Sequence, residues 1–392
     1  MSEKLLVPRI RFKEFTNAWE QWKARGILLP YRQKNDKNLA LISYSVSNKE
    51  GFVDQKEFFD EGGKAVYADK KNSLIISFDT FAYNPSRINV GSIALFKNTI
   101  NGLVSPIYEV FKVSANSNPD FIYLWFKSEC FNKIVANNSN KSVRDTLNLK
   151  QFEDNLLNLP VLQEQNKIAK LFSNLDSLIA LHQRKLSSLK NLKNRLLDKM
   201  FCDEKSQFPS IRFKEFTNAW EQWKVGDMFT VGRGSGITKR HISYTKHGDF
   251  KYPVYTSQTV NDGLLGYYNQ YNSFDAISWT TDGANAGSVS LRKGLFYSTS
   301  HCGVLSEKAF KPNDYFVIVL SKNTQKNVTW VAMPMLTTSA MSKIEAIIST
   351  DKSEQEKISL LIRSLDSLIT LHQRKLNSLK NIKNTLLEKM FV

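Results

Sequence analysis

Two stretches of the chain place apolar residues alternately three and four positions apart, the spacing of a long helix that packs along a narrow seam. They lie within residues 161–202 and 346–392. Each helix is expected to span about 40 residues, or roughly 60 Å at 1.5 Å per residue. The predicted seam positions are Ile168, Phe172, Leu175, Ile179, His182, Leu186, Leu189, Lys193, Leu196 and Met200 in the first helix, and Ile358, Ile362, Leu365, Ile369, His372, Leu376, Leu379, Lys383, Leu386 and Met390 in the second.

A seam this narrow must pack against a partner, and the nearest one is the other helix of the same chain. Parallel and antiparallel pairing are both open topologically. We favour antiparallel pairing, which gives an internal pseudo-two-fold repeat and places the globular segments at opposite ends. His182 and His372 are interpreted as polar residues that set the register, not as metal ligands. Pro160 ends the segment before the first helix, and Ser353 with Glu356 predicts a capping box for the second.

The chain also repeats itself outside the seam. Residues 10–23 recur without change as residues 211–224, and residues 175–201 recur as residues 365–391 with five substitutions in 27 positions. The long segments between these repeats cannot be aligned with each other. Internal repetition fixes the architecture before any motif is read. Here it predicts one scaffold used twice, with two different heads.

The predicted fold is mixed α/β, with two globular heads joined by two long helices that form an antiparallel coiled coil. In chain order the predicted parts are a lead segment (1–23), the first head (24–160), the first helix (161–202), a repeated lead segment (203–224), the second head (225–345) and the second helix (346–392).

Within the heads, β-branched and aromatic runs predict strands, with turns rich in Asn, Gly and Ser between them. Residues 74–78 and 315–320 are two such runs, and the glycine-rich segment 232–236 is interpreted as a tight turn near the start of the second head. The residues interpreted as anchors between each head and its helix are Trp19, Trp22, Trp220 and Trp223.

Composition narrows the class of function. The formal net charge is +17, spread along the chain without a basic tail. Such a charge suits contact with a nucleic-acid backbone, although an unrelated basic protein would also fit. Cys130, Cys202 and Cys302 lie far apart with no Cys-x-x-Cys pair, so we expect ordinary thiols in a cytoplasmic protein, with no disulfide and no metal site. The chain has no long apolar run, so we expect no signal peptide and no membrane partner.

Each head is preceded by Arg-Phe-x-Glu-Phe-x-x-x-Trp-Glu (residues 11–20 and 212–221) and followed by a leucine-rich helix that ends Leu-Leu-x-Lys-Met-Phe. In this arrangement the chain resembles, over essentially its full length, the specificity subunit of a type I restriction–modification system. The resemblance implies that each head is a target-recognition domain that reads one half of a split double-stranded DNA site. The helices would then space the two halves.

The resemblance also implies partners. Methyltransferase subunits, in two copies, would dock on the repeats, and a separate restriction and motor subunit would join for cleavage. A member of that family does no chemistry itself. No cofactor is therefore expected on this chain, and S-adenosylmethionine, ATP and Mg²⁺ would be bound by the partner subunits.

Some exposed residues of the helices are identical in both copies, which folding alone does not require. This identity predicts one surface offered twice to the same partner, and a solvated charged face is the alternative. The predicted partner-binding residues are Gln183, Arg184, Lys185, Gln373, Arg374 and Lys375.

The sequence shows no catalytic constellation. Adenine methyltransferases need an Asn/Asp-Pro-Pro-aromatic loop, and the nearest string, residues 84–87 (Asn-Pro-Ser-Arg), lacks the second proline and the aromatic. Nucleotide hydrolysis would need a glycine-rich loop that ends Gly-Lys-Ser/Thr, and segment 232–236 lacks that ending.

One local similarity links the heads: residues 81–92 and 277–288 both place polar, turn-forming residues between an aromatic residue and Gly-Ser. Arginine can grip guanine or phosphate, and asparagine can form two hydrogen bonds with adenine. Turns that only satisfy their own backbone are the alternative. The predicted DNA-binding residues are Asn84, Arg87, Asn89, Lys239, Arg240, His241, Thr281 and Asn285.

Two other classes of protein stay open at this point. One is a self-contained restriction or modification enzyme with divergent motifs, which would methylate or cut DNA unaided. The other is a coiled-coil adaptor whose heads bind proteins. DNA binding that weakens steeply with salt separates the predicted DNA reader from the adaptor.

Overall fold

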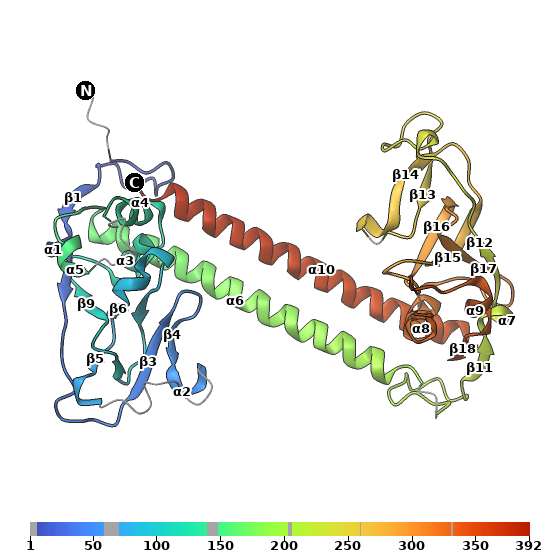
Figure 1. The fold of residues 1–392 in the computed structure, drawn as a ribbon, viewed down its shortest axis with the longest axis horizontal. Helices are drawn as coiled ribbons and strands as arrows, with labels where there is room; N and C mark the ends of the chain where they lie inside the picture. The colour runs from blue at the N-terminus through green and yellow to red at the C-terminus, as the bar shows by residue number, and fades with distance from the viewer. Residues whose placement is uncertain (1–5, 59–69, 139–147, 203–205, 259, 331) are drawn as a thin grey trace. The chain divides into compact units, whose positions relative to one another are not determined.

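The computed structural model describes residues 6–58, 70–138, 148–202, 206–258, 260–330 and 332–392 (Figure 1). The chain divides into two compact units. Unit 1 comprises residues 1–184 and 373–392, and unit 2 comprises residues 185–372. Each unit therefore contains one head and half of each long helix.

The two long helices are α6 (Leu162–Lys199) and α10 (Lys352–Lys389), of 38 residues each. All the predicted seam residues are buried or half-buried in both helices. In α6, all the residues between positions 173 and 195 that do not belong to the seam are exposed. The predicted heptad pattern is therefore confirmed, and the hydrophobic seam is what holds the helices in place.

In unit 1 the helices pack antiparallel. Phe172, near the start of α6, lies in one hydrophobic cluster with Met390, which follows the end of α10. Farther along the seam, Asp176 forms an ion pair with Lys383. The lysine occupies a seam position, and its charge is met by the carboxylate of the facing helix.

Unit 2 contains the same arrangement with the roles of the helices exchanged. Met200, which follows the end of α6, clusters with Ile358 near the start of α10. Lys193 pairs with Asp366 at the position equivalent to the Lys383 pair. Because each unit shows the start of one helix beside the end of the other, the predicted antiparallel pairing is confirmed.

The predicted cap of the second helix is wrong by two residues. Asp351, not Ser353, caps α10: its carboxylate accepts hydrogen bonds from the backbone N–H of Ser353 at 2.8 Å and of Glu354 at 3.1 Å. An Asp before the first helical residue satisfies N–H groups that have no partner inside the helix.

Unit 1 contains three small sheets with the strand orders β2-β9-β6-β7, β4-β3-β8-β5 and β1-β10. In chain order its head is made of β1 (Glu20–Lys23), α1 (Ala24–Ile27), β2 (Leu28–Pro30), β3 (Ile42–Ser47), β4 (Gly51–Asp54), α2 (Gln55–Phe58), η3 (Lys70–Asn72), β5 (Leu74–Ile76), β6 (Thr80–Tyr83), η4 (Pro85–Val90), β7 (Ile93–Phe96), β8 (Gly102–Val104), β9 (Glu109–Val113), α3 (Pro119–Phe126), α4 (Glu129–Asn138), α5 (Leu149–Phe152) and β10 (Leu156–Leu159).

Unit 2 contains a six-stranded sheet of order β12-β17-β15-β16-β13-β14 and the pair β11-β18. Its head is made of β11 (Glu221–Lys224), α7 (Val225–Met228), β12 (Phe229–Arg233), η5 (Lys239–His241), β13 (Tyr252–Tyr255), η6 (Val260–Gly263), β14 (Leu264–Tyr268), β15 (Ser273–Thr280), β16 (Val289–Ser298), β17 (Cys302–Glu307), α8 (Asp314–Thr324), η7 (Gln325–Asn327), α9 (Thr338–Lys343) and β18 (Glu345–Ile348).

The two heads share a topology that their sequences do not reveal. The order β2-β9-β6-β7 in unit 1 matches β12-β17-β15-β16 in unit 2, and all these neighbours pair antiparallel. Likewise, β1 pairs with β10 as β11 pairs with β18. The heads are thus two versions of one fold, and unit 2 extends the shared order with β13 and β14.

Two local predictions in the second head are wrong. Residues 315–320 form part of helix α8, because the side chain of Asn313 caps the N–H of Phe316 at 3.2 Å. The segment 232–236 is no tight turn: Gly232 lies inside β12. The backbone at Gly234 lies against residues 298 and 299, so that an added Cβ would be 2.3 Å from the carbonyl oxygen of Thr299. Strand β5 confirms the other predicted strand over residues 74–76.

A joint between lead segment, head and helices closes unit 1. Trp19 and Phe121 both contact Phe391, with ring centroids 6.1 and 5.3 Å away. Beside them, Arg11 donates two hydrogen bonds, of 2.8 and 2.7 Å, to the fully buried carboxylate of Glu164. The lead segment therefore holds the start of α6 and the end of α10 together.

The joint of unit 2 uses the equivalent residues. Trp220 and Tyr315 contact Phe201, with ring centroids 6.0 and 5.7 Å away. Arg212 donates two hydrogen bonds, of 2.6 and 2.8 Å, to the fully buried carboxylate of Glu354. The hydrogen bond to Glu354 raises the pKa of Arg212, so its guanidinium stays charged.

The anchoring role predicted for the tryptophans is confirmed for Trp19 and Trp220. It is wrong for Trp22 and Trp223, which lie in strands β1 and β11 of the two-stranded sheets β1-β10 and β11-β18. Trp22 is exposed. Trp223 packs against Phe310 of its own head. Trp19 and Trp220 lie just before these strands and are buried in the joints, whereas β1 and β11 are mostly exposed.

Candidate nucleic-acid interface

The turn between β15 and β16 forms a polar surface in unit 2. Thr281 is buried and donates to the carboxylate of Asp282 at 3.0 Å. The same carboxylate lies 2.9 Å from Nδ1 of the exposed His301. Asn285 is exposed in the turn. An imidazole oriented in this way and an exposed amide are both suited to contact phosphate or base edges.

A basic segment begins beside this turn. After Gly234, the chain passes the strand end at residues 298–302, where the N–H of Ser235 donates to Ser298 at 2.9 Å. It then forms η5, whose three basic residues are all exposed. Exposed basic residues of this segment in unit 2 are Arg233, Lys239, Arg240, His241, Lys246, His247 and Lys251. Such a cluster can neutralise several phosphates.

The equivalent turn of unit 1 lies between β6 and β7. The side chain of Asn84 caps η4 by accepting the N–H of Ser86 at 3.0 Å, which agrees with the alternative in which the turn satisfies its own backbone. Arg87 is exposed. Asn89 lies within η4, and its side chain is outside the described part of the structure. Gly91 closes the turn with φ of 75° and accepts a hydrogen bond from Lys127 at 3.1 Å.

The structure therefore gathers the predicted residues of the second head onto neighbouring loops. Thr281 and Asn285 share the β15–β16 turn, and the segment that carries Lys239, Arg240 and His241 starts beside it. Asn84, Arg87 and Asn89 belong to unit 1 and form their own turn. None of these placements tests a DNA contact, and the eight residues stay predictions.

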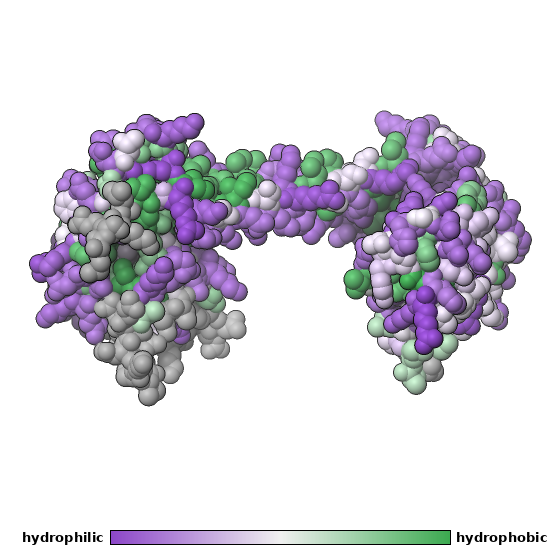
Figure 2. All heavy atoms as spheres, turned by 90° about the horizontal axis from the view of Figure 1, so that it is seen from above, coloured by the Kyte–Doolittle hydropathy of each residue, from purple (hydrophilic) through white to green (hydrophobic). Residues whose placement is uncertain are grey.

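The predicted partner-binding residues lie on the exposed surface of the long helices, with Gln373 half-buried. Next to them the helices carry exposed apolar residues outside the seam, which the sequence reasoning missed. They are Leu178, Leu181 and Ile382 in unit 1 and Leu368, Leu371 and Leu192 in unit 2, with Leu178 44% exposed. Figure 2 shows apolar side chains between hydrophilic ones along the helices. Their repetition at equivalent positions of both copies was the signal in the sequence.

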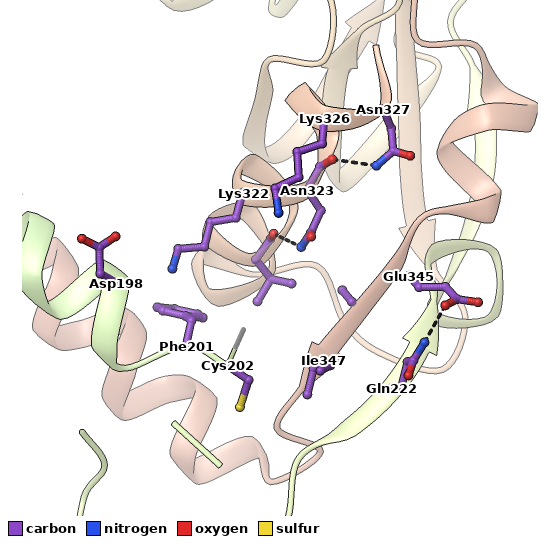
Figure 3. Close-up of a pocket in the computed structure, with 12 residues that line it drawn as sticks. Asp198, Phe201, Cys202, Gln222, Lys322, Asn323, Lys326, Asn327, Glu345 and Ile347 are labelled. Carbon is purple, nitrogen blue, oxygen red and sulfur yellow. Dashed lines mark hydrogen bonds between the residues drawn. The ribbon is translucent and has the colours of Figure 1, made fainter. Parts of the chain in front are cut away.

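A cavity of about 720 Å³ lies at the base of the head in unit 2 (Figure 3). Lys322 and Lys326 face it from α8 and η7, and Asp198 and Glu345 line it from α6 and β18. Burial lowers the pKa of Lys322, and its ammonium group donates to the carbonyl of Leu197. Two cations and two carboxylates balance, so the cavity does not select a ligand by charge, and we assign none.

Within the described ranges, no group of three His, Cys, Asp or Glu side chains could hold a metal ion. Cys130 and Cys202 are half-buried and Cys302 is buried, and none of the three forms a disulfide. No helix among the described residues is long and apolar enough to cross a membrane.

Two long antiparallel helices with a head of the same strand order in each unit define a duplicated scaffold, and its second head carries a basic, turn-rich surface suited to nucleic acid. Comparison with protein families gives a match to the type I restriction modification DNA specificity domain over residues 21–191 and 218–381. The chain belongs to this family of type I restriction–modification specificity subunits, and the resemblance that the sequence predicted is confirmed.

Individual relatives agree. A putative type I specificity subunit of Mycoplasma pneumoniae is 36% identical over 152 residues, which cover 37% of this chain and 40% of the relative. The match thus spans less than half of that relative. A second putative specificity subunit of the same organism is 31% identical over 235 residues, covering 59% of this chain and 82% of the relative. The crystal structure of a type I restriction–modification S subunit from M. genitalium superposes with a TM-score of 0.61 at 15% identity, over 98% of this chain and 99% of that one, which shows a shared fold.

Proposed function

We propose that this chain recognises a split DNA target and directs the other subunits of a type I restriction–modification complex to it. The observation that carries the proposal is the repetition of one strand order in two heads of unlike sequence, each fixed to its own joint of equivalent residues. A shared fold with different surfaces suits two readers of two different half-sites.

The long helices would set the gap between the half-sites. A helix of 38 residues is about 57 Å long at 1.5 Å per residue. This exceeds the roughly 34–36 Å of one DNA turn. Half-sites about one turn apart on one face of the duplex are therefore within reach. Exchange of a head should change one half of the recognised sequence, and insertion into the helices should change the gap.

The chain would act without chemistry of its own. S-adenosylmethionine, ATP and Mg²⁺ would be bound by the methyltransferase and restriction subunits. In this proposal the basic residues of η5 and Arg87 contact phosphates, and Asn89 and Asn285 contact base edges. Asn84 caps its own turn and the buried Thr281 donates to Asp282, so these two would support the turns that face DNA. Phosphate contacts supply affinity and base contacts supply sequence choice.

Methyltransferase subunits would dock on an exposed strip of the long helices, outside the seam between them, with one copy for each repeat. The strip combines the polar and charged residues Gln183–Lys185 and Gln373–Lys375 with exposed apolar residues such as Leu178 and Leu368. Apolar residues that stay exposed at matching positions of both repeats, on a helix whose own seam is already filled, favour a protein partner.

The proposed function predicts a single methylation motif. The full chain, co-expressed with a methyltransferase subunit of the same system in a host free of DNA methylation, should modify adenines in two half-sites separated by an unread gap. Mapping modified adenines over the genome measures this directly. The chain without the partner should modify nothing.

Other outcomes would favour the rival classes. Methylation or cleavage by the purified chain alone would mean that it is an enzyme. A stable complex that neither methylates nor binds DNA would indicate an adaptor for proteins. DNA binding that is insensitive to salt would also count against the proposal, since released counterions make phosphate-driven binding fall steeply with salt.

Replacing Leu178 and Leu368 together with aspartate should weaken binding of the methyltransferase subunit by at least about tenfold, since burying an unpaired charge in an interface is costly. Co-purification and titration calorimetry measure this loss. The matched control replaces Ser177 and Ser367, the exposed preceding residues, with aspartate and should leave binding unchanged. Equal affinity in both double variants would show that the partner docks elsewhere.

A further inference from the structure

The turn η6, which joins β13 to β14 in unit 2, has an unusual backbone. Asn261 and Asp262 both have φ of 52°, and Gly263 follows with φ of 78°. Left-handed conformations are uncommon outside glycine, and Asn and Asp tolerate them best. The turn also exposes its side chains: Val260 is 77% exposed, and Asn261 is exposed as well.

A buried arginine of strand β16 binds to this turn. Arg292 on β16 is 6% exposed and donates to the carboxylate of Asp262 at 2.7 Å and to the hydroxyl of Ser278 at 3.0 Å. Its guanidinium lies 3.9 Å from the centre of the Tyr255 ring. Arginine does not lose its proton in proteins, so burying it requires a partner for its charge. Asp262, although its side chain is 77% exposed, provides that partner.

The packing around Gly263 fixes the turn further. A Cβ at this position would lie 3.0 Å from the carbonyl oxygen of Gln258 and 3.3 Å from Arg292. The N–H of Thr256 donates to the carbonyl of Gly263 at 3.0 Å and closes the turn. The two residues that follow Asn261 are therefore fixed, which limits the conformations of its exposed side chain and lowers the entropic cost of binding.

The turn also lies beside the surface described above. The hydroxyl of Thr280, at the end of β15, is 3.5 Å from the carbonyl of Ser257, just before η6. The following residue, Thr281, opens the β15–β16 turn. At the far end of β14, the N–H of Ser243, after the basic η5, donates to Tyr267 at 2.9 Å. The polar β15–β16 turn therefore lies next to η6, and the basic segment meets the opposite end of the same strand.

The charges of the turn are compatible with DNA. A free carboxylate at its tip would repel phosphates, but the Asp262–Arg292 pair is neutral. The amide of Asn261 is an exposed polar group of η6, and it presents a donor and an acceptor side by side. This is the complement of the N7 and N6 edge of adenine in the major groove.

We propose that η6 is a base-reading turn of the second head, that Asn261 contacts an adenine edge directly, and that Arg292 and Asp262 position it. This inference rests on the proposed function and deepens it by naming a reader. The class of ligand is a duplex DNA half-site with adenine at one read position.

The test keeps the turn and changes only the reader. Asn261→Gly removes the amide while glycine adopts the same backbone, and Asn261→Asp keeps the shape but loses the donor. Each variant of the full chain is co-expressed with the methyltransferase subunit, and methylated sites are mapped. We expect one position of one half-site to become degenerate in Asn261→Gly, with discrimination reduced about tenfold or more. Asn261→Asp should disfavour adenine there.

Asp262→Asn tests the positioning role, because asparagine also tolerates the backbone but lacks the charge. It should loosen the same base position and leave the other half-site unchanged, with thermal unfolding measured in parallel. A lower melting temperature with an unchanged motif would overturn the positioning role. The control Asn269→Ala, at an exposed amide beyond the other end of β14, should leave the motif intact.

The outcomes for the reader and for the proposed function differ. If the unaltered chain gives no split motif, the proposed function fails and the reader with it. A second pair of outcomes is a split motif that is the same in the unaltered chain and in Asn261→Gly, or methylation in Asn261→Gly that weakens equally at all positions of the motif. In either case η6 does not read a base, and the proposed function still stands.

Discussion

Replacing Glu354 with alanine is expected to lower the free energy of unfolding by about 3–5 kcal/mol, because breaking a buried ion pair leaves a charge without its partner. The Glu354 carboxylate is fully buried and accepts two hydrogen bonds from Arg212. It also accepts one from the indole of Trp220 at 3.1 Å and one from the hydroxyl of Ser349 at 2.5 Å. Four donors would lose their acceptor at once. Urea denaturation followed by circular dichroism measures the change.

The matched control for this variant is Glu356→Ala, two residues along the same helix and exposed. Its effect should stay within about 0.5 kcal/mol, as for most surface substitutions. Glu354→Gln, which keeps the shape and some of the hydrogen bonds, should fall between the two. If Glu354→Ala and Glu356→Ala destabilise equally, the carboxylate does not hold the joint together.

Replacing Phe391 with alanine should cost about 3–5 kcal/mol, the usual range for truncating a buried phenylalanine. The ring stacks on Phe121 and meets Trp19 edge-on, so aromatic contacts add to the loss of buried area. Phe201→Ala should cost as much, because Phe201 occupies the equivalent place in unit 2. Differential scanning calorimetry of both variants measures the effects.

Phe208→Ala is the control for the aromatic joint, since Phe208 is exposed and belongs to the second lead segment. It should leave the melting temperature nearly unchanged. A large effect for Phe201→Ala with none for Phe391→Ala would show that the two joints are not equivalent in energy, despite their shared geometry.

The long helices could be predicted almost fully from the sequence, because a heptad repeat depends on local spacing that the chain states directly. Their antiparallel pairing was favoured but did not follow from the sequence, because both directions of pairing are open topologically. The missed helix α8 shows the limit. Its apolar run of residues 315–320 fits a buried strand or a buried helix equally well. The deciding signal was Asn313, a favoured N-cap residue just before it.

The common topology of the heads could not be predicted, because strands such as β2 and β9 pair over long separations in sequence. The candidate site was predicted only in part. Exposed basic residues such as Arg240 stand out in a sequence, whereas Arg292 looks like any other surface arginine until its burial is known. The exposed Leu178 was overlooked because leucines beside a heptad seam are usually taken for core.

The joint has a consequence for how new heads can be accommodated. Part of it lies in the repeated segments, and each head contributes, among other contacts, an asparagine cap and the first aromatic residue after it. In unit 1 these are Asn118 and Phe121, where the N–H of Asn118 donates to Gln165 of α6 at 2.9 Å. In unit 2 Asn313 donates to Gln355 of α10 at 3.2 Å. A different domain inserted between the repeats could pack on the joint if one of its helices began with this asparagine cap and aromatic residue. Only the surface away from the joint could diverge freely, so the same pair of helices can carry heads that differ where they face a ligand.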